Sequence, residues 1–234
     1  MHHLLEYQKN INPSNSMAIP KIIHQTFKSK ALPMITRWHI ARFRKKNPEY
    51  TYEFYDDERI SAFLQQEYGP EMNAAYQRLN IGAAKADFFR YAVLYKKGGI
   101  YLDIDSGINS RLDNFIHDDD AAIITKEGDP VFYAQWALIF SAGHPFLEKA
   151  IELVLDNINH NRYPHDVHQM TGPTVYTRAI KESLAQHPET NFRLLGTDYD
   201  GHLKVKYKLG KFFLYEKKAD HWKQKQLTTP VLKP

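Results

Sequence analysis

Apolar residues recur along this chain with two alternating spacings. Short apolar runs predict strands, and stretches with apolar residues three and four positions apart predict helices. The predicted strands are Ile22–Thr26, Thr51–Tyr55, Ile100–Asp103, Ala121–Thr125, Ala137–Ser141, Phe192–Leu195 and Lys211–Tyr215. The predicted helices are Met34–Lys46, Asp57–Tyr68, Glu71–Arg78, Ala83–Lys97, Pro145–Ile158 and Pro173–Gln186. Strands that alternate with helices predict an α/β fold with a single mixed, mostly parallel sheet flanked by helices.

Length and composition indicate one globular domain. The 234 residues are 43% hydrophobic, which is enough to form a core, and no internal repeat or linker divides them. We therefore expect an N-terminal extension over residues 1–18 and one domain over residues 19–234. The chain has no cysteine, which excludes a disulfide framework, a thiolate zinc site and a cysteine nucleophile. Because no apolar run reaches about 18 residues and residues 1–18 lack a signal-peptide pattern, we expect a cytoplasmic protein.

Two carboxylates follow the predicted strand that begins at Ile100. Side chains alternate along a strand, so Asp103 and Asp105 are expected to point the same way. Carboxylate oxygens are the ligands that Mg²⁺ and Mn²⁺ prefer, and such ions keep open positions for phosphate oxygens. An Asp-x-Asp pair in a solvated turn is the alternative, but the helix break at Gly98-Gly99 favours a metal site that serves a diphosphate-bearing substrate.

The helix before this strand carries a second pair of charged residues. Asp87 and Arg90 are three positions apart and therefore lie on one helical face. One interpretation is a surface ion pair that contributes about 0.2–0.5 kcal/mol. The other is that the pair offers an acceptor and a forked donor to sugar hydroxyls, close to the carboxylates that follow.

The whole segment resembles the Asp-x-Asp glycosyltransferases of family 32, which include yeast initiating α-1,6-mannosyltransferases, bacterial capsule and lipooligosaccharide transferases and clostridial toxin glucosyltransferases. The residues that match are Ala86-Asp87, Arg90-Tyr91, Leu94, Gly98-Gly99, Ile100-Tyr101-Leu102 and Asp103-Ile104-Asp105. Residues 19–25, which read IPKIIHQ, resemble the first strand of that family, and Thr171-Gly172-Pro173 resembles a segment of its mannosyltransferase branch.

This resemblance implies a GT-A fold and a retaining, metal-dependent hexosyltransferase. The donor would be a UDP- or GDP-sugar, and the acceptor a hydroxyl of a glycan or lipid-linked glycan, as in polysaccharide biosynthesis. It further implies that Mn²⁺ or Mg²⁺ binds Asp103 and Asp105. Asp87 and Arg90 would hold the donor sugar, and Asp103 the ribose or a metal-bound water. The residues expected to line the donor site are Tyr101, His24 and Gln25.

The C-terminal segment shows a partial similarity to the end of that family. His221 would be a further metal ligand, and Trp222, expected to be exposed in a lysine-rich stretch, would close over the donor and shield the leaving phosphate. Thr171 is either the cap of the helix that starts at Pro173 or part of an anion-binding helix end. The acidic run from His117 to Asp120 predicts a solvated turn.

The net charge of +4 is uneven along the chain. Cations concentrate in Arg37–Lys46 and in Lys204–Lys225, which indicates either a solvated surface or peripheral docking on anionic lipid at the inner membrane face. No nucleic-acid-binding motif accompanies the charge, so we expect no nucleic acid partner. Two other functions stay open from sequence: a haloacid-dehalogenase-type phosphatase that uses the same Asp-x-Asp pair, and a non-catalytic carbohydrate-binding protein.

Overall fold

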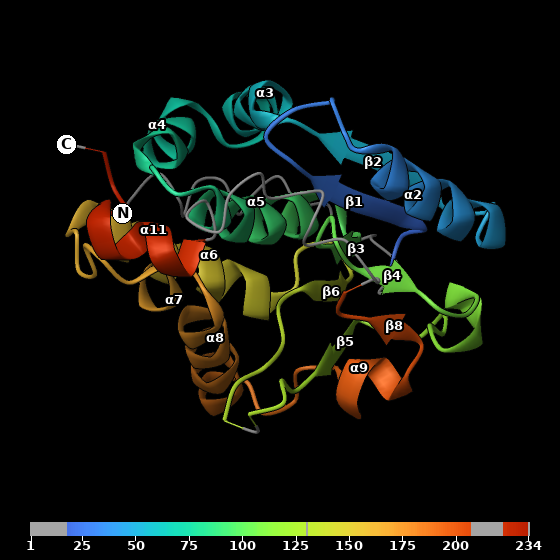
Figure 1. Ribbon diagram of the computed structural model, residues 1–234. Helices are drawn as coiled ribbons and strands as arrows, with labels where there is room; N and C mark the ends of the chain where they lie inside the picture. Colours follow the sequence, from blue (N-terminus) through green and yellow to red (C-terminus); the bar gives the residue numbers. More distant parts are fainter. Residues whose placement is uncertain (1–17, 130, 207–221, 234) are drawn as a thin grey trace.

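A six-stranded mixed sheet forms the centre of the computed structural model, which describes residues 18–129, 131–206 and 222–233. The strand order is β2-β1-β3-β6-β5-β7, with β1, β2 and β3 mutually parallel, β6 antiparallel to both of its neighbours, and β7 parallel to β5 (Figure 1). The strands are β1 (Ile22–Thr26), β2 (Thr51–Tyr55), β3 (Gly99–Leu102), β5 (Ala122–Thr125), β6 (Ala137–Phe140) and β7 (Arg193–Leu195). A separate antiparallel pair joins β4 (Gly107–Ile108) to β8 (Leu203–Lys204).

Helices cover both faces of this sheet, and alternation along β3 assigns the faces. The helices are α2 (Met34–Lys46), α3 (Asp57–Tyr68), α4 (Pro70–Arg78), α5 (Gly82–Lys97), α6 (Pro145–Asn159), α7 (Val167–Met170), α8 (Pro173–Gln186), α9 (Thr197–Asp200), α11 (Trp222–Thr228) and the 3-10 turn η2 (Leu112–Asn114). Tyr101 belongs to the larger core cluster, with α3 to α8. Ile100 and Leu102 belong to the smaller cluster, with α2, β4 and α9. A side chain that continues the parity of Tyr101 therefore faces α5.

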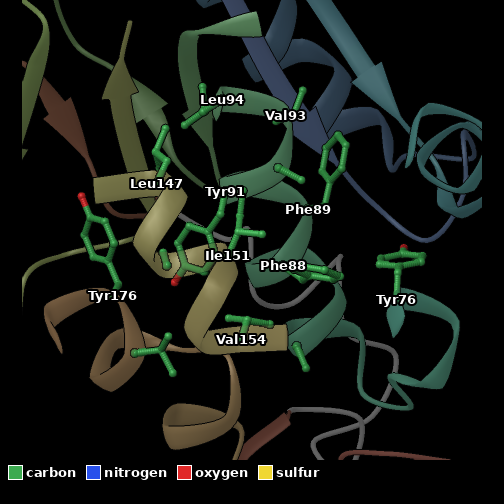
Figure 2. Close-up of a cluster of buried hydrophobic side chains, with 14 of the residues drawn as sticks. Tyr76, Phe88, Phe89, Tyr91, Val93, Leu94, Leu147, Ile151, Val154 and Tyr176 are labelled. Carbon is green, nitrogen blue, oxygen red and sulfur yellow. The ribbon is translucent and has the colours of Figure 1, made fainter. Parts of the chain in front are cut away.

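Helix α5 lies in the interior of the larger layer and is buried on several faces. Figure 2 shows Phe88 and Phe89 on the side of Tyr76 from α4, and Tyr91 beside Ile151 from α6. The rings of Tyr91 and Tyr176 stack with centroids 5.9 Å apart. A helix this deeply buried holds Asp87 and Arg90, described below, away from solvent.

The two glycines between α5 and β3 allow a close approach of the chain to β1. Gly98 and Gly99 have φ values of 61° and 99°, which favour glycine. A Cβ atom on Gly99 would lie 2.5 Å from the carbonyl oxygen of Ile22, and one on Gly98 would lie 2.7 Å from the Pro20 ring. The glycines thus do more than end a helix, because they bring β3 into register beside β1.

Most of the predicted elements are confirmed with small shifts at their ends. One shift matters for function: β3 ends at Leu102 rather than at Asp103. The short elements β4, β8, α7, α9, α11 and η2 were not predicted. The strand predicted at Lys211–Tyr215 lies outside the described residues, as does the extension up to residue 17. Among the described helices, none combines the length and the apolar character that crossing a membrane requires.

The C-terminal residues are anchored in the core. After α11, the side chains of Val231 and Leu232 are buried, and the backbone of residues 231–233 bonds to Pro164, Asn80 and Arg78. Trp222 is half-buried and packs against the larger cluster, so the expectation that it is exposed is wrong. Removal of this end would therefore expose core surface.

Candidate functional site

The Asp-x-Asp motif forms a turn directly after β3. The amide of Asp103 donates to the Trp136 carbonyl at 2.8 Å, and the amide of Ser106 donates to the Asp103 carbonyl at 2.9 Å. Residues 103–106 therefore turn back instead of extending the strand, so alternation along a strand does not apply to Asp105, and a common direction of the two carboxylates stays a prediction. Asp105 is buried, and about a third of the Asp103 side chain is exposed.

Asp103 keeps the parity of Tyr101 and faces Arg90 of α5. Its Oδ1 atom accepts from Arg90 Nη2 at 3.0 Å and from the Tyr101 hydroxyl at 3.3 Å. The Arg90 guanidinium lies over the Tyr101 ring, 4.7 Å from its centroid. One carboxylate oxygen is thus fixed by two donors, which orients the side chain.

Arg90 forms an ion pair with Asp87, which lies one helical turn earlier in α5. Arg90 Nη2 lies 3.2 Å from Asp87 Oδ1, and each of the two side chains is 5% exposed. Arg90 Nη1 donates to the Gln135 carbonyl at 2.5 Å. The interpretation of Asp87 and Arg90 as a surface ion pair is therefore wrong, because both side chains are buried and their other contacts are with protein groups.

Two residues from distant parts of the chain complete the Asp87 environment. Gln135 Nε2 donates to Asp87 Oδ1 at 2.8 Å, and Thr171 Oγ1 donates to Asp87 Oδ2 at 2.9 Å. The Tyr91 hydroxyl lies 2.6 Å from Gln135 Oε1 and 3.0 Å from the Thr171 carbonyl oxygen. Buried carboxylates need such donors, since an unpaired buried charge is costly. The result is one connected polar network from Thr171 to Asp103.

The electrostatics of this network follow from burial and from the two carboxylates around one guanidinium. Burial raises the pKa of Asp87 to about 6, against the opposing charge of Arg90 and the Thr171 hydrogen bond. Removal from water also raises the pKa of Asp103, and Arg90 opposes this effect. Arg90 is therefore the charge that opposes the effect of burial on the pKa of both carboxylates.

Sequence reasoning missed Gln135 and misassigned Thr171. Gln135 lies in an irregular segment before β6, and no local pattern marks it as the partner of a helix 48 positions earlier. Thr171 does not cap α8, whose cap residue is Gly172, and its hydroxyl turns to Asp87 instead. The sequence feature that could have marked Thr171 as a site residue is its place in the Thr-Gly-Pro segment.

His24 and Gln25 support the site through its backbone. Gln25 Nε2 donates to the Asp103 carbonyl at 3.1 Å and its Oε1 accepts from the Tyr52 hydroxyl. His24 is fully buried, its Nε2 lies 3.0 Å from the Gly98 carbonyl oxygen, and burial lowers its pKa to about 4. The neutral ring therefore carries its proton on Nε2 and donates it in a hydrogen bond to the Gly98 carbonyl oxygen. A place for these two residues near a nucleotide stays a prediction.

The residues at the turn fit a hard divalent cation. Both Asp103 hydrogen bonds fall on Oδ1, which leaves Oδ2 without a hydrogen bond from the described residues, and Asp105 adds a second carboxylate two positions on. Oxygen donors of this kind suit Mg²⁺ or Mn²⁺. His221, which was predicted as a further metal ligand, lies outside the described residues.

A second acidic group lies elsewhere, in the loop that precedes β5. Within the described parts of the chain, the grouping of three metal-type ligands within 4.8 Å of one another comprises His117, Asp119 and Asp120. Asp120 already accepts from Arg193 on both oxygens, at 2.5 and 2.6 Å, and from the His117 amide at 2.7 Å. This carboxylate therefore closes the predicted turn and fixes Arg193 of β7, but Asp120 is buried, so the expectation of a solvated turn holds for residues 117–119 and is wrong for Asp120.

Trp222 begins helix α11, which is hydrogen-bonded to helix α7. Gln226 Oε1 accepts from the Val167 amide at 3.0 Å, which ties α11 to α7, and α7 leads directly into Thr171. The proposed shielding of the leaving phosphate by Trp222 stays a prediction.

Comparison with known proteins identifies the region that surrounds this geometry. Residues 36–122 match the family described as a glycosyltransferase sugar-binding region containing a DXD motif. The chain is 35% identical over 147 residues to inositol phosphoceramide mannosyltransferase 3 of Schizosaccharomyces pombe, an alignment that covers 62% of this chain and 40% of that protein. It is 30% identical over 195 residues to the initiation-specific alpha-1,6-mannosyltransferase of the same yeast, covering 71% of this chain and 49% of the other. The chain thus spans less than half the length of both relatives.

Solved structures support the same fold. The PaToxG glycosyltransferase superposes with a TM-score of 0.58 at 21% identity, covering 79% of this chain and 76% of that one. The fold is therefore the GT-A type that the sequence resemblance predicted, and the resemblance to Asp-x-Asp glycosyltransferases is confirmed. Neither the fold nor the relatives support the phosphatase alternative.

Proposed function

We propose that this chain, whose residues 36–122 are a DXD-containing glycosyltransferase sugar-binding region, moves a hexose from a nucleoside diphosphate sugar to a hydroxyl of a glycan or lipid-linked glycan. The observation that carries the proposal is the buried Asp87–Arg90 pair, which fixes one oxygen of Asp103 at the turn after β3. Burial of an ion pair carries a desolvation cost, and in this chain the pair holds the Asp103 carboxylate at the turn.

The chemistry assigns separate tasks to the residues of the turn and the helix. Asp103 and Asp105 would hold Mn²⁺ or Mg²⁺, and a cation bound there offsets the negative charge that builds on the departing diphosphate. Arg90 orients Asp103 and favours its ionised form, while Asp87 balances the guanidinium. Direct contact of Asp87 and Arg90 with donor hydroxyls would require each to share or leave a protein partner. We therefore assign them first to the positioning of Asp103.

The relatives narrow the choice of donor and acceptor to test first. Both yeast relatives are named as mannosyltransferases, so mannose from GDP-mannose is the first candidate, followed by UDP-hexoses. One relative is named for transfer to inositol phosphoceramide, which makes a lipid-linked acceptor reasonable here too. We expect retention of the anomeric configuration, with attack on the donor face that the leaving phosphate vacates.

The test is a hydrolysis and transfer screen on the purified chain. GDP-mannose, UDP-glucose, UDP-galactose and UDP-GlcNAc are incubated with the protein and Mn²⁺, and sugar release is followed by NMR, which also reports the anomer first formed. We expect one donor to be consumed, with loss of the activity when EDTA is added. If a folded protein consumed none of these donors with Mn²⁺, or with Mg²⁺ in its place, the proposal would be contradicted.

A further inference from the structure

A basic pocket lies on the α2 side of the molecule, next to the segment that follows the Asp-x-Asp turn. It has a volume of about 310 Å³ and is lined by residues of α2, β4 and β8. These elements lie on the same side of the molecule in Figure 1. Its floor is apolar, with buried Phe43 and Ile108. Its other lining residues are His39, Arg42, Lys46, Gly107, Asn109 and Lys204.

The cations around this pocket are not balanced by acids. No acidic residue is among those that line it, and within the described ranges Arg42, Lys46 and Lys204 form no ion pair. Cations in the adjoining loops behave differently, because Lys21 pairs with Asp113 at 3.0 Å and Arg111 pairs with Glu49 at 2.8 Å. Uncompensated positive charge is thus concentrated at the pocket instead of being spread over this surface.

The pocket is also preorganised. Lys46 Nζ donates to the Asn109 carbonyl oxygen at 2.7 Å, which holds the ammonium group over the pocket and leaves two of its three protons for a ligand. Burial and the positive charges of Arg42 and Lys204 lower the pKa of His39. Arg42 belongs to α2 and Lys204 to β8, so cations from two elements affect the same imidazole ring. The Arg42 guanidinium rests over the Trp38 ring, 5.5 Å from its centroid.

We propose that this pocket binds the phosphate group of a molecule other than the sugar donor. A guanidinium and two ammonium groups around one volume provide donors and charge for phosphate oxygens, and the apolar floor suits the carbon skeleton attached to them. Gly107 lines the pocket and lies two residues after Asp105, so the bound phosphate sits beside the Asp-x-Asp segment. The phosphate can come from a lipid headgroup or from a soluble phosphorylated sugar.

The proposal concerns binding and does not depend on the proposed sugar transfer. Its test uses the full chain, a Lys46→Gln/Lys204→Gln variant and a charge-matched Lys45→Gln/Lys181→Gln control, both of whose lysines are exposed and lie outside the pocket. Thermal unfolding establishes that each protein folds. Binding is measured to inositol 1-phosphate and inorganic phosphate by calorimetry, and to vesicles of phosphatidylcholine with and without phosphatidylinositol by sedimentation.

We expect the pocket variant to bind the phosphate probe about 25-fold more weakly, at about fivefold for each cation removed, and the control to match the parent. Binding to vesicles with phosphatidylinositol alone would identify a lipid headgroup as the source, and binding to inositol 1-phosphate alone would identify a soluble one. Equal weakening in both variants, or no binding of any phosphate probe by the parent, would overturn the proposal. Donor hydrolysis is measured in parallel, so failure of transfer and failure of phosphate binding are read separately.

Discussion

The hydroxyl of Thr171 offers a sharp test of the buried network, because it can be removed with little change of shape. Thr171→Val deletes the donor to Asp87 Oδ2 at a fully buried position. A hydrogen bond to a charged group contributes about 1.5–3 kcal/mol, and a neutral one about 0.5–1.5 kcal/mol. We therefore expect a loss of about 1.5–3 kcal/mol in unfolding free energy while Asp87 is ionised. Thr171→Ser keeps the hydroxyl and is the matched control.

The loss should depend on pH, and its sign follows from linkage. The Asp87 pKa, about 6 in the folded parent, lies above the ordinary value of 3.8, and removal of a donor raises it further. Unfolded parent and variant titrate alike, so the folded variant keeps its proton to higher pH and loses more stability as pH rises through 6. Urea unfolding at pH 5, 7 and 8.5 should give a parent–variant difference that is smallest at pH 5. A difference independent of pH would refute the reasoning that an ionised Asp87 uses this hydroxyl.

Two further predictions concern the support of the site. Burial lowers the pKa of His24 from 6.5 to about 4, so the contribution of the neutral ring to stability is present above pH 6.5 and is lost as pH falls toward 4. The unfolding free energy of the parent should therefore fall by up to about 3 kcal/mol over this pH range. Urea unfolding of His24→Gln over the same range should lack this component. Removal of residues 230–234 deletes the buried side chains of Val231 and Leu232 and uncovers the core surface that they pack against, and it should lower the unfolding free energy by about 3–6 kcal/mol. An unchanged denaturation midpoint after this truncation would show that the C-terminal contacts are not formed in solution.

The sequence predicted those features that local patterns encode. The strand β1 and the helix α2 were predicted to the residue because the apolar spacing and the break at Asn47-Pro48 are local signals. The pairing of Asp87 with Arg90 was likewise readable from helical geometry.

Other features depend on contacts that no local pattern carries. Burial of the Asp87–Arg90 pair follows from packing of α5 between α4 and α6, and Gln135 reaches Asp87 only once β6 is in place. The basic pocket brings Lys46 to Lys204, which are far apart in sequence. Likewise, the turn after Leu102 depends on tertiary partners, since the Asp103 carbonyl accepts from Gln25 of β1.

The central claim is that the turn after β3, and not the acidic group before β5, binds the metal and the donor. Calorimetric titration with Mn²⁺ and the consumed nucleotide sugar tests it directly on Asp105→Asn, with Asp119→Asn as the control because Asp119 belongs to the other acidic group. We expect Asp105→Asn to lose Mn²⁺-dependent donor binding with its fold intact, and Asp119→Asn to bind like the parent. Retention of donor and metal binding by Asp105→Asn, or its loss in Asp119→Asn, would contradict the assignment.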